Sequence, residues 1–227
     1  MLISLYKLVF AFPVPIILAL MLNEIGNRIF KKTVQTIIYL PHFISWVVIA
    51  GILLQFFSPT NGAINVIREF FGMAPVNTNL MTVRPTFRAV LVISEILKEC
   101  GWGTIIYLAA FSMVDPNLYE AARVDGAGKL KQIIHITLPC ISGVIVILLI
   151  LNISALMEAG FDQILAMMND IVKEVSDIID TFVYSKGIQG GKYSYTTTVS
   201  LFKSVVSLVL IIGADRAAKA IGEEGLL

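Results

Sequence analysis

The sequence has 227 residues, of which 57% are apolar and 15% are charged, and its mean hydropathy is +0.84. Soluble domains average roughly 45–50% apolar and about 25% charged residues, so this composition excludes an ordinary soluble domain. A net charge of +1 gives no reason to expect nucleic acid as a partner. The two cysteines, Cys100 and Cys140, fit neither a disulfide framework nor a CxxC metal site, and we interpret both as small packing residues.

Five apolar stretches are long enough to cross a membrane, because a hydrocarbon core of roughly 30 Å requires about twenty apolar residues in a helix. No small-residue cleavage site follows the first stretch, which predicts a retained span rather than a signal peptide. Pro13 and Pro15 are expected to kink the first span, and Pro41 to break the second. The prediction is an all-α integral membrane protein, a single transmembrane domain over 1–227 with spans at roughly 2–22, 34–57, 87–111, 139–157 and 196–213.

Lys and Arg in the connecting segments predict the orientation, because these residues favour the cytoplasmic side of a membrane. Segments 23–33, 112–138 and 214–227 carry eight of them in 52 residues, whereas 58–86 and 158–195 carry five in 67. The first three segments are therefore predicted to be cytoplasmic. This places the C-terminus in the cytoplasm and the N-terminus outside.

The polar segment 112–138 predicts a helical hairpin between the third and fourth spans. Asp115 is a good N-cap and Pro116 suits the first helical position. Gly126 is expected to end the short helix in a left-handed conformation, and Pro139 to open the next span. The second helix of the hairpin is expected to have a broad apolar face and a polar remainder, formed by Leu130, Ile133, Ile134 and Leu138 and by Lys129, Lys131, Gln132 and Thr137.

The short helix before Gly126 carries almost no side-chain bulk at Ala121 and Ala122. A partner's surface can therefore approach its backbone closely, with Glu120 and Arg123 flanking the bare patch. Short amphipathic connectors between spans are also common. On physical grounds alone, a docking element and a plain solvent-facing connector are about equally favoured.

The stretch "EAARVDGAGKLKQIIHITLP", residues 120–139, resembles the EAA loop of permease subunits in binding-protein-dependent ATP-binding-cassette (ABC) importers. That pattern is Glu-Ala-Ala, three residues, Gly, nine residues and Ile-x-Leu-Pro. The stretches "FPVPIILALMLNEI", "YLPHFISWVVIAGI", "GWGTIIYLAAF", "DIIDTFVY" and the terminal "GEEGLL" resemble the LplB-type branch of sugar permeases, which imports oligosaccharides or polysaccharide fragments. The positions that match the EAA pattern are Glu120, Ala121, Ala122, Gly126, Ile136, Leu138 and Pro139, with Asp125 and Ala127 completing the frequent "DGA".

The resemblance implies a type I ABC importer permease core of six helices, of which this sequence shows five. The expectation is that the chain is truncated at its N-terminus. The resemblance further implies that the short helix of 112–138 is a cytoplasmic coupling helix seated on a separate ATPase. The other implied partners are a second, non-identical permease and an extracellular solute-binding lipoprotein, at a bacterial cell membrane.

Neither "AGKL" nor "GGKY" has the upstream glycine and the Ser or Thr that a phosphate loop needs. We therefore expect a transport subunit that is not an enzyme and has no cofactor, with ATP hydrolysed by a partner. The alternative is a truncated membrane scaffold that docks the ATPase and transports nothing. A transporter must couple an external substrate to ATP turnover, whereas a scaffold would dock without that dependence.

The third predicted span contains Glu95, Lys98 and Glu99, and charges at this depth usually face a bundle interior or a water-filled cavity. Lys98 is expected to pair with Glu95 at i, i+3, leaving Glu99 nearly neutral or hydrogen-bonded. One hypothesis is a polar substrate path; the alternatives are a structural knot of ion pairs or a helix end nearer the interface. The path hypothesis adds three residues, the aromatic Trp102 and Tyr107 for stacking on sugar rings and the polar Asn152.

The two histidines have no partner at ligand spacing, so a metal site is not expected. His42 is expected to support the kink after Pro41, and His135 to lie on the surface of the hairpin. The external segment 158–195 has apolar residues at helical spacing. It is predicted either to be a lid-like re-entrant helix over the bundle or to form part of an outer gate, and the two hypotheses are compatible.

Overall fold

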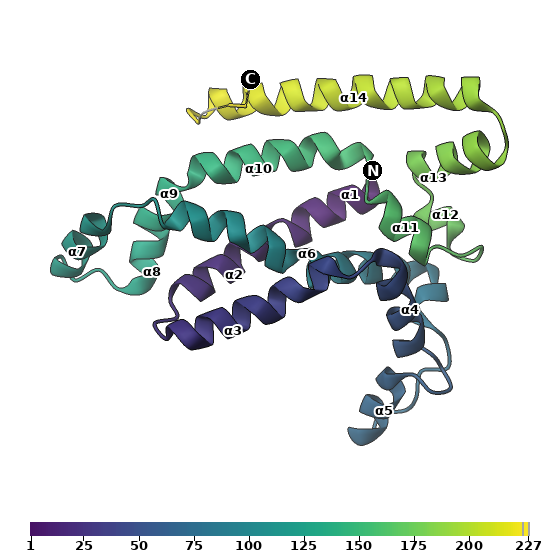
Figure 1. The fold of residues 1–227 in the computed structure, drawn as a ribbon, viewed down its shortest axis with the longest axis horizontal. Coiled ribbons are helices and arrows are strands. Elements are labelled where there is room, and N and C mark those ends of the chain that lie inside the picture. The colour runs from purple at the N-terminus through teal and green to yellow at the C-terminus, as the bar shows by residue number, and fades with distance from the viewer. Residues whose placement is uncertain (224, 227) are drawn as a thin grey trace.

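The protein is described by a computed structural model over residues 1–223 and 225–226; Glu224 and Leu227, part of the terminal "GEEGLL" stretch, lie outside the described residues. Every regular element in the described part is helical, which confirms the all-α prediction. Helix α14 (Tyr193–Ala220) lies beside α10 (Ser142–Ser154), and a second layer contains α6 (Arg84–Phe111) with the first helix and α3 (Arg28–Tyr39) packed on it (Figure 1). Helix α7 (Pro116–Val124) lies at one end of this bundle.

The first predicted span is one helix over Leu2–Asn23, formed by α1 (Leu2–Tyr6), a π-helical turn η1 (Lys7–Ala11) and α2 (Pro13–Asn23). The π turn directly precedes Pro13. Proline has no N–H, so a neighbouring turn widens, and the Phe12 N–H donates to the Lys7 carbonyl five residues back. A second π turn, η4 (Ile133–Thr137), precedes Pro139 in the same way.

The second predicted span, 34–57, bends by 100° and is therefore not a single straight helix. Helix α3 continues into a 3₁₀ turn, η2 (Leu40–Phe43), and α4 (Trp46–Phe56) leaves in a new direction, with Ser45 capping it. The break predicted at Pro41 is thus confirmed, but it is a sharp turn and not a kink. Beyond it, α4 and α5 (Ala63–Phe70) project from the bundle, and a 3₁₀ turn η3 (Leu80–Thr82) leads back to α6 (Figure 1).

The fourth predicted span is also bent, by 64°, and its start differs from the prediction. Pro139 does not open the span; it lies inside the helical run of α8 (Lys129–Gln132), η4 and α9 (Leu138–Cys140). The bend falls at Ile141, between α9 and α10. Because the π turn accommodates the missing proline N–H, the chain stays helical through Pro139.

Length and composition make Leu2–Asn23 and Tyr193–Ala220 single membrane-spanning candidates, and each bent pair would add one more. Helix α6 has 28 residues, about 42 Å at 1.5 Å per residue. It is not among these candidates, since Glu95, Lys98 and Glu99 lie in its middle. The predicted third span therefore corresponds to a helix of sufficient length whose charges need protein or water around them.

The predicted external segment 158–195 is not one lid-like helix. It consists of four short pieces after the η5 turn (Ala155–Met157) that ends α10. The pieces pack at the end of the bundle opposite α7 (Figure 1), where Ile164, Phe87 and Leu91 belong to one buried cluster. The four pieces are α11 (Phe161–Met167), α12 (Lys173–Ser176), α13 (Ile179–Val183) and the π turn η6 (Tyr184–Gln189).

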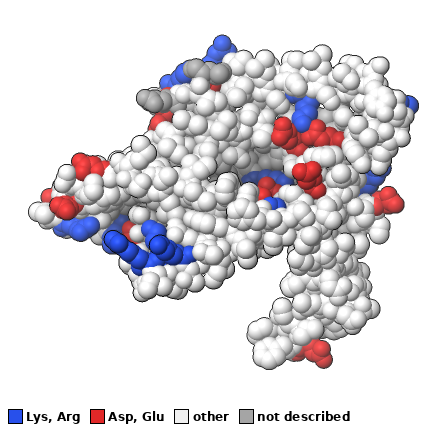
Figure 2. Space-filling model, in the orientation of Figure 1, with Lys and Arg blue, Asp and Glu red and all other residues white. Residues whose placement is uncertain are grey.

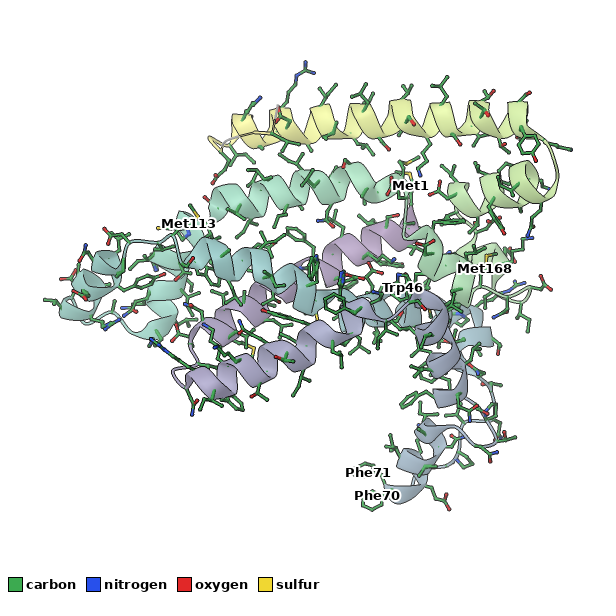
Figure 3. All side chains as sticks on the ribbon, in the orientation of Figure 1. Met1, Trp46, Phe70, Phe71, Met113 and Met168 are labelled. Atoms are coloured by element: carbon green, nitrogen blue, oxygen red, sulfur yellow. The ribbon has the colours of Figure 1, made fainter. Side chains whose placement is uncertain are left out.

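The outer surface is largely apolar, as expected for a chain that lies in lipid or against other subunits. Phe70 and Phe71 at the tip of α5 are exposed, and side chains stand outward along α14 (Figure 3). Most of the face in Figure 2 is uncharged, and acidic and basic side chains gather around the α7 end and in a recess on the opposite half. These two charged regions are where polar chemistry is concentrated on this face of an otherwise apolar bundle.

Candidate functional site

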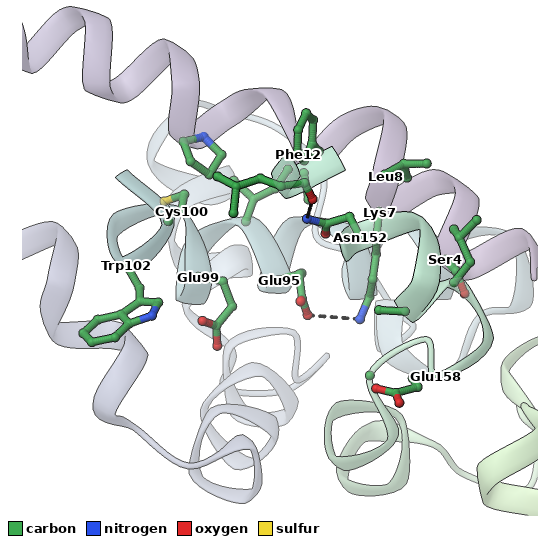
Figure 4. Close-up of a pocket in the computed structure, with 18 of the residues that line it drawn as sticks. Ser4, Lys7, Leu8, Phe12, Glu95, Glu99, Cys100, Trp102, Asn152 and Glu158 are labelled. Atoms are coloured by element: carbon green, nitrogen blue, oxygen red, sulfur yellow. Dashed lines mark hydrogen bonds and ion pairs between the residues drawn. The ribbon is translucent and has the colours of Figure 1, made fainter. Parts of the chain in front are cut away.

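A cavity of about 360 Å³ lies between the first helix, α6, and the end of α10 with the turn that follows it (Figure 4). We call it the central cavity. It is within the size range of protein ligand pockets, roughly 300–1,000 Å³. Its wall mixes apolar side chains with polar and aromatic ones, and these are Ser4, Lys7, Phe12, Glu95, Glu99, Trp102, Tyr107, Asn152 and Glu158.

The structure brings most of the predicted path residues to this one cavity. Glu95, Glu99, Trp102 and Tyr107 line it from α6, and Asn152 lines it from α10. Lys98 does not line the central cavity. Its side chain is only 8% exposed and reaches to the other side of α6, where it lines a separate pocket with His42.

The predicted pairing of Lys98 with Glu95 is wrong. The Lys98 ammonium lies 3.0 Å from Glu99 Oε1 and donates to the His42 carbonyl, while His42 Nδ1 lies 2.7 Å from Glu99 Oε2. The His42 ring stacks on Trp102, with centroids 4.4 Å apart and 5° between the planes. These contacts form because the 3₁₀ turn η2, which contains Pro41 and His42, packs against this side of α6. Through His42, the bend in the second predicted span is bonded to α6.

The true partner of Glu95 is Lys7, which the sequence reasoning missed. Lys7 Nζ lies 3.0 Å from Glu95 Oε2 and donates to the carbonyl of Ala159 at 2.9 Å. One signal was available, since Lys7 is the single charged residue of the predicted span 2–22. An intramembrane cation needs a partner in the protein.

The lining of the central cavity offers hydrogen-bonding groups and an aromatic face. Carboxylate oxygens at Glu95, Glu99 and Glu158 accept hydrogen bonds, Asn152 and Lys7 donate, and Trp102 offers an aromatic face. This set suits a ligand with many hydroxyl groups. In the part of the chain that the structure describes, no three His, Cys, Asp or Glu side chains come together as a metal site.

The second candidate region is the hairpin over residues 116–139, which we call the α7 hairpin. Asp115 Oδ1 accepts from the Asn117 N–H at 2.9 Å and so caps α7, as predicted. Gly126 has φ +75° and ends the helix in the predicted left-handed conformation, and the Ala127 N–H donates to the Ala122 carbonyl. The Tyr119 hydroxyl lies 2.9 Å from Thr137 Oγ1 and fastens α7 to η4.

The EAA residues divide into an exposed tip and a packed base. Glu120, Ala121, Asp125 and Gly126 are exposed, and Ala122 is partly buried. At the base, Ile136 packs on the cluster that contains Tyr107 and Phe111, Leu138 is partly buried, and Pro139 is exposed. The tip is therefore free to meet another protein, while the base fixes it to the bundle.

The second helix of the hairpin follows the predicted division into an apolar and a polar face only in part: Lys129 and Lys131 are exposed and Ile133 and Leu138 are partly buried, but four other residues differ. Gln132 and Thr137 are buried, whereas Leu130 is 70% exposed and Ile134 is also exposed. Gln132 turns inward because its amide donates to the Ala127 carbonyl at 2.8 Å and thereby closes the turn. With Val124, which is 88% exposed, the outward Leu130 adds apolar area to the free surface of the hairpin.

Comparison with known proteins identifies the class. The chain matches the family of binding-protein-dependent transport system inner membrane components over residues 11–223, and it belongs to that family. It is 48% identical over 215 residues to the polygalacturonan/rhamnogalacturonan transport system permease protein YteP of Bacillus subtilis (strain 168). It is 46% identical over 219 residues to protein LplB of the same organism.

These alignments cover 95% and 96% of this chain, and the chain spans 66% and 68%, about two thirds, of the length of those relatives. The fold superposes with a TM-score of 0.94 and 40% sequence identity on a chain of a bacterial alginate ABC transporter. That transporter was solved in complex with an alginate pentasaccharide-bound periplasmic protein, and the match covers 99% of this chain and 77% of the other. The resemblance seen in the sequence is thereby confirmed, and the chain is a membrane protein of the permease class.

Proposed function

We propose that this chain is the transmembrane permease subunit of an ATP-driven ABC importer for oligosaccharides or polysaccharide fragments. The observation that carries the proposal is the superposition of 99% of the chain, at 40% identity, on a subunit of an alginate transporter. Two relatives agree in kind, one named for polygalacturonan transport and one, 25% identical, for arabinooligosaccharides. All three names concern chains of sugar residues.

The central cavity is the proposed substrate path. It combines the acceptors Glu95 and Glu99, the amide of Asn152 and the aromatic face of Trp102 in one space inside the bundle. Sugar hydroxyls can pair with these groups one at a time while the ring slides over an aromatic face. Tyr107 is almost fully buried at the cavity wall and supports its far end.

The α7 hairpin is the proposed ATPase-coupling element. Its exposed tip, Glu120 to Gly126, offers a small-residue surface, and the contacts of Tyr119 and Ile136 make its base rigid. A rigid element between two global states is what transmits a movement from one subunit to another. On this proposal ATP is hydrolysed by a separate cytoplasmic subunit.

The proposed assembly has further partners. A second, non-identical permease completes the path, and an extracellular solute-binding lipoprotein delivers the sugar. The complex sits in a bacterial cell membrane with the α7 hairpin and the C-terminus in the cytoplasm. The Lys and Arg bias of the connecting segments supports this orientation.

The test is co-purification of the chain in nanodiscs with the genomically adjacent permease and a cognate ATPase, comparing Gly126→Arg with Gly72→Arg. Both glycines have left-handed backbone, φ +75° and φ +69°, with open space around them. The two variants therefore carry equal backbone strain, but only one lies on the hairpin. We expect Gly126→Arg to lose the ATPase and Gly72→Arg to retain it.

The same preparations decide between transporter and scaffold. Adding the binding protein with candidate oligosaccharides should stimulate ATP hydrolysis severalfold for the wild type and for Gly72→Arg. Docking without stimulation by any oligosaccharide would support a scaffold instead. Equal retention of the ATPase by both variants would refute the role of the hairpin.

A further inference from the structure

Three segments distant in sequence meet at Lys7. Its side chain is 12% exposed, and its ammonium bridges Glu95 of α6 at 3.0 Å and the carbonyl of Ala159, in the turn between α10 and α11, at 2.9 Å. In Figure 4 a dashed line joins Lys7 to Glu95 at the wall of the central cavity. Lys7 therefore ties the first helix, α6 and the 158–160 turn together at the cavity wall.

The position of this contact matters because it lies at one end of the cavity. Ser4, Lys7 and Gly160 line the end near the N-terminus, and Tyr107 lines the wall farther along α6. Glu95 and Tyr107 are twelve residues apart, about 18 Å along the helix. The end closed by Lys7 is thus the one opposite the α7 hairpin (Figure 1).

The backbone around the contact is adapted to it. Lys7 begins the π turn η1, a geometry that is frequent at functional sites. Ala159 has φ +53°, the only left-handed non-glycine residue among those described, and Gly160 follows with φ +81°. A Cβ at Gly160 would lie 2.5 Å from Lys7 Nζ, so a side chain at residue 160 would displace the ammonium from its present position.

A second acceptor stands beside the first. Gln163 is fully buried, and its amide donates to the Leu91 carbonyl and to Ser94 Oγ on α6. Its Oε1 has no hydrogen-bond partner among the described residues. Both this Oε1, at 3.6 Å, and Lys7 Nζ lie close to the position that a Cβ of Gly160 would occupy. Buried acceptors are rarely left unpaired, so Gln163 Oε1 is available to Lys7 when Glu95 is engaged elsewhere.

We propose that Lys7 is a positioning residue of the transport path, a latch that holds the 158–160 turn against α6 and closes this end of the central cavity. Ligand hydroxyls that hydrogen-bond to Glu95 compete for its carboxylate, and Lys7 then turns to Gln163 Oε1 and no longer bridges Glu95 to the turn. This inference rests on the proposed function, because it assumes that the cavity is a transport path. It adds a residue outside α6 and α10 that controls access to that path.

The native thiol of Cys100 provides a probe, since Cys100 lines the central cavity. In a Cys140→Ala background it is the single cysteine of the chain. The experiment measures the rate at which a charged, membrane-impermeant thiosulfonate added to one side of right-side-out vesicles modifies Cys100. The variants are Lys7→Gln, Glu95→Lys and the charge swap that combines Lys7→Glu with Glu95→Lys.

The latch predicts faster modification, by roughly tenfold, when Lys7→Gln removes the charge-assisted hydrogen bonds. The charge swap restores the ion pair between positions 7 and 95 but not the bond to the turn, because a carboxylate at position 7 cannot donate to the Ala159 carbonyl, so its rate should stay well above that of the wild type. Gly160→Ala should raise the rate without changing any charge, because its Cβ displaces the ammonium. Lys203→Gln breaks a comparable pair, Lys203 with Asp180 at 2.7 Å between α14 and α13, and should leave the rate unchanged.

An unchanged rate in Lys7→Gln, or a charge swap that returns to the wild-type rate without a donor for the Ala159 carbonyl, overturns the latch. Equal acceleration by Lys203→Gln would show general loosening and overturn it too. If Lys7→Gln fails to fold, the charge swap and Gly160→Ala still decide. The proposed function is tested separately, because failure of any oligosaccharide to stimulate ATP hydrolysis leaves the Cys100 rates interpretable.

Discussion

At the scale of single residues, Gly101 is where α6 and α3 approach most closely. A Cβ on Gly101 would overlap the carbonyl oxygen of Ile38. We expect Gly101→Ala to destabilise the protein by roughly 1–3 kcal/mol, the usual cost of overpacking, because the clash is with backbone and cannot be relieved by a rotamer change. Thermal unfolding in detergent measures the effect.

The matched control is Gly213→Ala, because Gly213 lies inside α14 with nothing near its missing Cβ. Alanine in a helix interior is favoured over glycine by roughly 0.5–1 kcal/mol, so this variant should be neutral or slightly stabilised. If both variants unfold at the same temperature, the close approach of α6 to α3 does not exist.

The charged residues of α6 show what the sequence could and could not predict at this scale. Their number and spacing predicted that Glu95 and Glu99 face a cavity, and the structure places both there. Which ion pairs form was not predictable, because i, i+3 spacing allows Lys98 to pair with Glu95. The packing of η2 and of the first helix against α6 instead provides other partners for both residues. Lys98 is drawn to His42 and Glu99, and Lys7 takes Glu95 from a position 88 residues away.

At the scale of elements, a hydrogen bond between two side chains joins the two halves of the α7 hairpin. The Tyr119 hydroxyl and Thr137 Oγ1 are 2.9 Å apart, and Thr137 is buried. Tyr119→Phe keeps the ring and removes the hydroxyl, so Thr137 Oγ1 keeps only its 3.5 Å contact with the Gln132 carbonyl, and the loss should cost about 1 kcal/mol. We expect faster amide hydrogen exchange in α7 and η4 while α14 keeps its protection.

Thr137→Val removes the other hydroxyl, and the double variant should be hardly less stable than either single one, because both remove the same contact. Fully additive effects in this cycle would contradict a direct Tyr119–Thr137 bond. Asp115→Ala is a useful comparison. It frays α7 at its N-cap, again by about 1 kcal/mol, without touching the contact between the halves.

The elements were largely predictable because each has a local cause. Apolar length predicted the helices, Asp115 and Gly126 predicted both ends of α7, and Pro41 predicted a break. The angles were not predictable, since the 100° turn after Pro41 depends on how η2 meets α6. The burial of Gln132 in α8 has a similar origin, because the Ala127 carbonyl that accepts from its amide reaches that position only once the turn at Gly126 has formed.

At the scale of the whole molecule, α6 connects the two candidate regions. It carries Glu95 near one end of the central cavity and ends at Phe111, sixteen residues or about 24 Å farther on, just before α7 begins. The base of the hairpin packs on the same helix through Ile136, near Tyr107. A displacement of the hairpin therefore acts on the helix that forms one wall of the cavity, which is the coupling that an ATP-driven permease requires.

Filling the cavity should separate transport from ATPase docking. Asn152 and its neighbour Leu151 are both exposed on α10, but only Asn152 lines the central cavity. Asn152→Trp puts an indole into a space of about 360 Å³, so we expect oligosaccharide uptake by proteoliposomes to be abolished while the ATPase still co-purifies. Leu151→Trp adds the same bulk outside the cavity and should leave both intact. Unimpaired uptake by Asn152→Trp would mean that sugar does not pass through this cavity.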